Sequence, residues 1–343
     1  MPSSIQQAGG HQRQKGVGLV EIMISLVLGL LVTGAIVQIY LTTKRQNDMQ
    51  GSLTARQESA RFAAQVIQRD AQMAGFRGCL RDVGNVTNTL NNATNFLYRY
   101  ERHVEGFENA VGVPASIASV VAGTDVLTLR TVDDPGVSTT AAMGSATANP
   151  VTVAGLAPAR LVANDIALIT DCGGASIFQV TGFDPATGII IHAANVGTPG
   201  NDPAKNLVRR YAADSQVFTI RTTTYYIRNS ANGTGPALWR RSGAVAAPQE
   251  LAEGVENLQV LYGVDTDANQ AADEYRTANN VSAAEWANVV SLQVALLVSG
   301  VTDRVAESDP RTFTLLDKLV GPFADGRVRR VVSFTVALRN RLS

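Results

Sequence analysis

An uncharged apolar stretch near the N-terminus constrains the fold of this 343-residue chain more than any other feature. From Val17 to Leu41 the only formally charged side chain is Glu21. At about 1.5 Å per residue, a helix over this range is roughly 37 Å long. A bilayer core is about 30 Å thick, so the stretch is predicted to be a transmembrane helix.

The flanks of this stretch differ from those of two common membrane segments. A secretory signal peptide has an apolar core of about 7 to 15 residues followed by a small-residue cleavage site, whereas this stretch continues into Thr42–Gln72 without one. A carboxylate is unexpected in an ordinary membrane anchor, because an acid at the centre of a membrane helix costs about 2.5–3.5 kcal/mol. Glu21 therefore either snorkels to the membrane surface or has a partner.

The string from Gly16 onwards closely resembles the class III leader of type IV prepilins, because the glycine is followed by Val-Gly-Leu-Val-Glu-Ile-Met-Ile-Ser-Leu. The resemblance implies that prepilin peptidase removes residues 1–16 by cutting after Gly16 on the cytoplasmic side, and that Val17 is then methylated. Arg13 and Lys15 of the leader fit the positive charge expected on the cytoplasmic flank. The mature chain would then have two more acidic than basic residues, which argues against general nucleic-acid binding.

The same resemblance implies a role for Glu21, the fifth residue counted from Val17. In pilins this glutamate neutralises the N-terminus of an adjacent subunit, and two opposite charges about 4 Å apart gain about 4 kcal/mol at an effective dielectric near 20. Glu21 is therefore expected to set the register between helices. Val17 and Gly18 depart from the family, which most often has phenylalanine and threonine there, and Gly18 weakens the first helical turn.

The rest of the chain predicts a helix followed by strands. Residues 42–74 continue the helix, with an apolar stripe (Phe62, Ala63, Val66, Ile67, Met73), and Gly75 and Gly78 end it. Beyond Cys79 the apolar period changes to two. Strands are expected at 126–132, 165–170, 177–181, 188–192, 218–227, 258–264, 290–298 and 332–338, with a hairpin joining 225–227 to 238–240.

With 45% hydrophobic residues the chain can bury a core beyond its anchor. The expected fold is therefore α+β: a long N-terminal helix packed on an antiparallel β-sheet, as in pilins. The domains are a cleaved leader (1–16), a membrane half of the helix (17–41), a periplasmic half (42–74) and a β-rich periplasmic domain (75–343). Residues 85–95 and 137–150 are expected to be loops.

Two cysteines, Cys79 and Cys172, lie in the part expected outside the cytoplasmic membrane. An even number in an oxidising compartment predicts one disulfide; two free buried thiols are the alternative. Ala74–Cys79, Asp171–Val180, Glu253–Asp265 and Val336–Asn340 resemble PilW-type minor pilins. This resemblance implies a low-abundance subunit that starts type IV pilus assembly and caps the fibre tip.

Other patterns carry weaker hypotheses. Asp265, Asp267, Asn269 and Asp273 have oxygen ligands at a spacing found in calcium loops, but Gln270 stands where an EF-hand needs glycine, so a solvated turn is the preferred interpretation. No catalytic motif surrounds His103 or His192, so the protein is expected not to be an enzyme and to need no other cofactor. Arginines near the last strand could bind DNA or a surface, or could protect a sheet edge. They are Arg327, Arg329, Arg330, Arg339 and Arg341.

The sequence thus predicts a minor pilin that is anchored once in the bacterial inner membrane and later enters the pilus. Its expected partners are prepilin peptidase, other minor pilins, the major pilin and a tip adhesin. A minor pseudopilin of type II secretion shares the leader, the helix and Glu21 and stays an alternative. A membrane-anchored periplasmic enzyme or binding module is the alternative from another class.

Overall fold

The computed structural model describes residues 18–80, 85–132, 136–146, 150–154, 161–233, 235–243, 247–300, 310–338 and 340, without the side chains of 45 and 48–57. The chain forms two units, residues Met1–Gly51 and Ser52–Ser343. Each is described by itself below. The predicted cleavage site, Gly16 and Val17, lies outside the described residues.

The described part of the first unit is the beginning of helix α1, which runs from Leu19 to Met73. The Gly18 carbonyl accepts hydrogen bonds from the backbone N–H groups of Glu21 (2.9 Å) and Ile22 (3.2 Å), and so starts the first turn. Residues Leu19–Lys44 have a mean hydropathy of 2.4 and are long and apolar enough to cross a membrane. The predicted membrane helix is therefore present in length and composition.

In the second unit the C-terminal part of α1 buries a face made mostly of alanine against the sheets. These are Ala60, Ala63, Ala64, Ile67, Ala71 and Ala74. Phe62, which the sequence placed on this face, is 47% exposed, so that prediction was wrong. The alanines let the helix backbone approach the strands closely, and a phenylalanine ring between them would hold the two layers apart.

Helix α1 ends where the glycines predicted. Gly75 has a φ of 74°, a conformation that glycine adopts without steric cost, and its N–H donates to the Arg130 carbonyl at 3.1 Å. The chain thus leaves the helix directly beside strand β3 (Val126–Val132). The described residues also form short 3₁₀ helices at Glu108–Ala110, Ala278–Asn280 and Glu285–Asn288.

The larger sheet has nine strands in the order β1-β7-β6-β10-β11-β12, with β3 and β4 also paired to β10 and β2 paired to β3. Its remaining strands are β1 (Val86–Asn88), β2 (Val104–Phe107), β4 (Val137–Ser138), β6 (Ile166–Asp171), β7 (Gly174–Gln179), β10 (Gln216–Asn229), β11 (Pro236–Ser242) and β12 (Gln249–Glu253). Among the described strands, β1 and β7 pair in parallel and the other pairs are antiparallel. The hairpin between β10 and β11 has the expected location.

A second sheet has four strands in the order β14-β13-β15-β18. They are β14 (Glu274–Arg276), β13 (Val255–Val264), β15 (Val289–Ser299) and β18 (Arg329–Ala337). One face packs with α1 in the largest core cluster, through residues such as Leu258, Val294 and Leu296. The other face carries a two-stranded hairpin, β16 (Phe313–Leu315) and β17 (Lys318–Val320).

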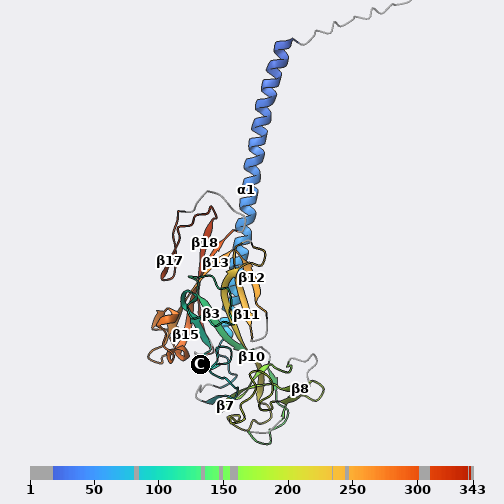
Figure 1. Ribbon diagram of the computed structural model, residues 1–343, viewed down its shortest axis with the longest axis vertical. Helices are drawn as coiled ribbons and strands as arrows, with labels where there is room; N and C mark the ends of the chain where they lie inside the picture. Colours follow the sequence, from blue (N-terminus) through green and yellow to red (C-terminus); the bar gives the residue numbers. More distant parts are fainter. Residues whose placement is uncertain are drawn as a thin grey trace, which may run out of the picture. The chain divides into compact units, whose positions relative to one another are not determined.

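A small three-stranded sheet, β5-β9-β8, completes the second unit. Its strands are β5 (Val151–Thr152), β9 (Ile189–Ile191) and β8 (Gly182–Asp184). Figure 1 shows β7 and β8 at the end of this unit opposite to β17 and β18. The α+β prediction is confirmed, but both segments expected to be loops contain a strand: β1 lies within 85–95 and β4 lies within 137–150. Their pairing partners are distant in sequence, and local composition does not reveal them.

Candidate assembly surface

The exposed apolar part of α1 is the most unusual surface of the molecule. Its large side chains from Leu19 (76% exposed) to Leu41 (47% exposed) have nothing to pack on among the described residues of their own unit. Monomeric soluble proteins rarely expose apolar patches of more than a few hundred Å². This surface therefore requires lipid or other protein chains around it.

Glu21 lies in the first turn of this apolar helix. Its side chain is exposed, and its backbone carbonyl accepts a hydrogen bond from Ser25 Oγ at 2.7 Å. A carboxylate in the first turn also faces the positive end of the helix dipole, which stabilises it. Glu21 is thus available to a partner outside its own chain.

The end of α1 is tied to the larger sheet by a disulfide. Cys79 and Cys172 are joined with their Cα atoms 4.9 Å apart. Next to the bond, Thr170 Oγ1 donates to the Arg77 carbonyl at 2.9 Å, and a Cβ on Gly78 would come within 2.8 Å of Thr170 Cγ2. Only glycine fits at this close approach, which also has a φ of 65°.

Asp70 fixes the helix to the sheet one turn before its end. The Tyr225 hydroxyl donates to Asp70 Oδ2, and Tyr225 is fully buried in β10. Burial and the neighbouring Asp70 carboxylate raise the pKa of Tyr225 above its ordinary value. Tyr225 therefore stays neutral and donates the bond at physiological pH. Its neighbour Tyr226 pairs across the hairpin with Trp239, and both are buried, so these aromatics form core.

Asp125 joins the two large sheets. It precedes β3, its Oδ2 accepts from Val260 N in β13 at 2.9 Å, and its own N–H donates to Leu258 O at 2.8 Å. Its Oδ1 accepts from Asn109 N at 2.9 Å. Burial raises the pKa of Asp125 to about 7, although these backbone hydrogen bonds oppose the shift. Sequence reasoning missed this residue, because its partners at 109, 258 and 260 are distant from it in the sequence.

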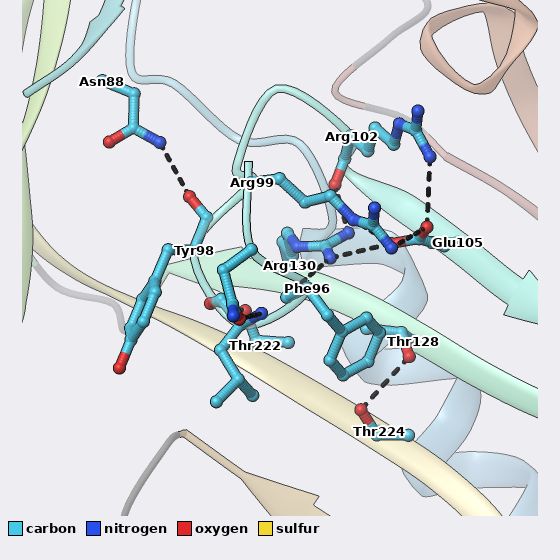
Figure 2. Close-up of polar contacts among 12 residues, drawn as sticks. Asn88, Phe96, Tyr98, Arg99, Arg102, Glu105, Thr128, Arg130, Thr222 and Thr224 are labelled. Atoms are coloured by element: carbon cyan, nitrogen blue, oxygen red, sulfur yellow. Dashed lines mark hydrogen bonds and ion pairs between the residues drawn. The ribbon is translucent and has the colours of Figure 1, made fainter. Parts of the chain in front are cut away.

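A second missed group is the buried cluster around Glu105, shown in Figure 2. Glu105 is 4% exposed and accepts from Arg130 Nη2 (2.9 Å), Arg99 Nε (2.9 Å) and Arg102 Nη1 (3.2 Å). Arg130 also donates to the carbonyls of Arg102 and Phe96, each at 2.7 Å. Satisfied in this way, a buried charge can be tolerated, and the cluster holds the segment 96–105 on β3. A charged residue in the middle of strand 126–132 was the signal for it.

The calcium candidates lie in the loop after β13. Ligand oxygens of Asp265, Asp267 and Asp273 lie within 4.8 Å of one another. Thr266 donates to Asp273 Oδ2 from both its backbone N and its Oγ1, each at 2.7 Å, and these bonds lower the pKa of Asp273. Asn269 N donates to Asp267 Oδ1 at 3.1 Å and to Asp265 Oδ1 at 3.2 Å. The loop thus uses its own acids to hold its shape, and calcium binding stays a prediction.

Among the described arginines near the last strand, Arg329 and Arg330 have different surroundings. Arg329 is 4% exposed and pairs with Glu256 and with Asp325, at 3.1 Å and 2.7 Å. Arg330 is exposed. Arg339 and Arg341 lie outside the described residues. Arg329 is therefore not available to the DNA- or surface-binding edge that the sequence suggested.

The histidines of the second unit have structural neighbours. The ring Nε2 of His103 forms a 2.8 Å hydrogen bond with the Val289 carbonyl in the core, and the His192 ring lies 5.2 Å from the Phe178 ring at a tilt of 52°.

Comparison with known proteins gives these features a family. The prokaryotic N-terminal methylation motif matches residues 11–37, which contain Gly16, Val17 and Glu21. This motif lies on an exposed apolar helix that precedes a mostly antiparallel β domain, an arrangement similar to that of type IV pilins. The sequence model of the Type IV Pilus-assembly protein W family matches residues 224–340, from within β10 to just beyond β18. The chain thus carries a prepilin methylation motif at its N-terminus and resembles the PilW family, a structural family, over its C-terminal third.

One solved structure is similar to the chain, a type IV-like pilin from Thermus thermophilus. It shares 17% sequence identity, with a TM-score of 0.22, and the match covers 54% of this chain and 87% of that one. No curated protein matches the chain. The segments around Cys79 and Cys172, which also resembled PilW-type pilins, lie outside both matched ranges.

Proposed function

We propose that the protein is a minor pilin that takes part in starting type IV pilus assembly and in forming the tip complex. The observation that carries this proposal is that one chain combines the methylation motif at 11–37 with the pilus-assembly sequence at 224–340. An exposed apolar helix with a carboxylate in its first turn supports it, because such a helix can move from lipid into a bundle of similar helices.

In the proposed sequence of events, the chain is inserted once in the inner membrane with its C-terminal domain in the periplasm. Prepilin peptidase then cuts after Gly16, and Val17 is methylated. Glu21 pairs with the N-terminus of a neighbouring subunit, which sets the register. The partners are other minor pilins, the major pilin and a tip adhesin, and the final location is the pilus.

Mass spectrometry of the mature N-terminus tests the processing step. We expect a chain that begins with methylated Val17. An intact leader, or a cut beyond Leu41, would contradict the proposal and favour a membrane-anchored enzyme or binding module. Replacing Gly16 by alanine should leave the leader in place, whereas replacing Gly18 should not.

Deletion of the gene tests the role in assembly. We expect fewer surface pili and normal type II secretion, because the family match concerns pilus assembly. Lost secretion with normal pili would instead support the alternative of a minor pseudopilin. Labelling of the protein along isolated pili distinguishes a tip position from a distribution over the whole fibre.

A further inference from the structure

The second sheet ends in a long strand with one unoccupied edge. Strand β18 pairs with β15 from Arg329 to Ala337 without a register shift, and it is the last strand of its sheet. Leu338 N–H donates to the Val290 carbonyl at 2.8 Å, in register with this pairing. Hydrogen-bonded pairs alternate along an antiparallel ladder. The even-numbered residues of β18 therefore direct their backbone groups to β15, and the odd-numbered ones direct theirs outwards.

Four residues thus present free N–H and C=O groups along this edge: Val331, Ser333, Thr335 and Ala337. In the part of the chain that the structure describes, no hydrogen bond occupies these groups. Ser333, Thr335 and Ala337 are also exposed. Each outward pair of groups is consequently able to bond to an additional strand.

The edge also lacks most of the features that usually block strand addition. Strand β18 runs for nine residues without proline, lysine or bulge, and its two charged residues, Arg329 and Arg330, are confined to its start. At the edge of the larger sheet, β12 is shorter, with five residues, carries Glu250 and Glu253, and has an irregular register with β11. Short, charged and irregular edges resist pairing, so the difference between the two edges singles out β18.

A groove of about 730 Å³ lies beside β18, between that strand and the C-terminal part of α1. Its apolar part includes Val332, Phe334 and Ala64, and Val332 and Phe334 are only partly buried. Its rim carries Arg61 and Arg330. Both arginines are exposed, and neither has an acidic partner among the described residues. The groove can therefore take apolar side chains next to an acidic one.

We propose that β18 is a docking edge for an extended segment of another polypeptide, which adds to the sheet as a further strand. Its backbone pairs with the four odd-numbered residues, its apolar side chains enter the groove, and an acidic side chain lies against Arg61 and Arg330. A helix could not satisfy this edge, because its backbone groups are already bonded internally. A second copy of β18 fits less well, since its sequence contains no acid to meet the arginines.

Strand addition at β18 is a binding activity separate from the proposed processing and assembly steps, because it does not depend on cleavage after Gly16. The probe is a labelled synthetic peptide of about ten residues that alternates valine and threonine and has an aspartate at each end. It is titrated into the purified full chain in detergent, with fluorescence anisotropy as the readout. Hydrogen exchange of the β18 amides is measured with and without the peptide.

Two variants at one position separate the edge from its side chains. Thr335→Pro removes an outward N–H and no bond to β15, so the sheet should stay folded. Thr335→Val keeps that N–H. We expect the wild type and Thr335→Val to bind the peptide equally, and Thr335→Pro to bind about tenfold more weakly or not at all. Arg330→Glu should weaken binding of this peptide and improve binding of one with lysines at its ends.

In the wild type, the peptide should slow exchange at Ser333, Thr335 and Ala337, whereas Val332 and Phe334 should exchange slowly even without it. Absence of binding to the wild type, or equal binding by Thr335→Pro, would overturn the proposal. So would outward amides that exchange slowly without peptide and do so increasingly at higher protein concentration, because a second copy would then cover the edge. These measurements do not depend on methylation or cleavage. A negative result at β18 would therefore leave the proposed function untouched, and failure of the proposed function would leave strand addition untouched.

Discussion

The N-terminal and C-terminal parts of α1 are both apolar, but they differ in side-chain size and in surroundings. Residues 19–41 carry leucine, isoleucine and valine, and their large side chains are exposed. From Ala60 to Ala74 the buried face is mostly alanine, with Ile67 as its one large member. The buried face between Ala60 and Ala74 has small side chains because the strands approach the helix backbone closely there.

The N-terminal and C-terminal parts of α1 therefore have different roles. Large side chains gain most from transfer out of water, so the N-terminal part gains its stability from whatever surrounds it. The alanine face gains little per residue and instead allows α1 to pack on a sheet with few voids. Changes in the C-terminal part should therefore affect the free energy of unfolding of the domain, and changes in the N-terminal part should affect assembly.

Removing the disulfide should have the largest effect on the domain. For the double variant Cys79→Ser with Cys172→Ser we expect the free energy of unfolding to fall by about 4–5 kcal/mol in the chain-entropy model, because the bond closes a loop with a sequence separation of 93. Urea unfolding measures this loss. Reduced wild-type protein is the matched control and should lose the same amount. Equal stability of oxidised and reduced protein would contradict the prediction.

A smaller effect on the free energy of unfolding is expected from the ionisation of Asp125, whose pKa is raised to about 7 in the folded protein. Between its unfolded value near 3.8 and about 7, the folded state binds a proton that the unfolded chain releases. Stability is therefore highest at low pH and falls as the pH rises through this window. From pH 5 to pH 8 the loss attributable to Asp125 should be roughly 2–3 kcal/mol.

Unfolding of the wild type and of Asp125→Asn at both pH values measures this contribution. The charged groups that act on Asp125, Glu108 and Lys318, are present in both proteins, so the comparison of slopes isolates Asp125. The variant should start from a lower stability, because Asn109 N and Val260 N donate to different oxygens of Asp125 and the asparagine NH2 group would replace one of these acceptors with a donor. Equal pH slopes in the two proteins would refute the assignment.

Enlarging an alanine in each part of α1 tests the contrast directly. Ala63→Leu should lower the stability of the domain by about 1–3 kcal/mol, because the buried face has no room for the added atoms. Ala35→Leu makes the same change in the exposed part and should leave domain unfolding unchanged. If the two variants were equally stable, the alanine face would not be the close contact that the structure shows.

The smallest effect on stability should come from Glu21→Val. We expect no measurable change in domain unfolding and intact membrane insertion, because the carboxylate has no partner among the described residues of its own chain. Piliation should nevertheless fall, as the proposed register pair is lost. Electron microscopy of cells counts the pili, with Ser25→Ala as the control that keeps the acid. Normal piliation in Glu21→Val would contradict a register role.

Much of the fold could be predicted because its signals are local. The end of α1 at Gly75, the whole of β3 and the hairpin before Trp239 follow from periodicity and turn chemistry in short windows. The parallel pair β1–β7 could not be predicted this way, because its partners are far apart in the chain. Whether Phe62 is buried depends on how closely the sheet approaches α1, and the helical spacing of apolar residues carries no information about that distance.

The candidate site divides in the same manner. Glu21 stands out in sequence because an acid in an apolar run is costly. Asp125 and Glu105 carry no such local signature, since their importance comes from strands and arginines that only the folded chain brings to them. The open edge of β18 was equally invisible, because alternation predicts a strand but does not say whether both of its sides are paired.

The bond between Cys79 and Cys172 also limits how far the chain can be drawn out. A pull between α1 and the C-terminal strands would extend an unfolded domain, and each freed residue adds about 3.3–3.6 Å of length. The disulfide keeps the segment between its two cysteines, which are 93 positions apart, closed under such a load. The stretched chain is therefore roughly 300 Å shorter than it would be without the bond. The disulfide therefore acts as a tether that keeps the stretched molecule short.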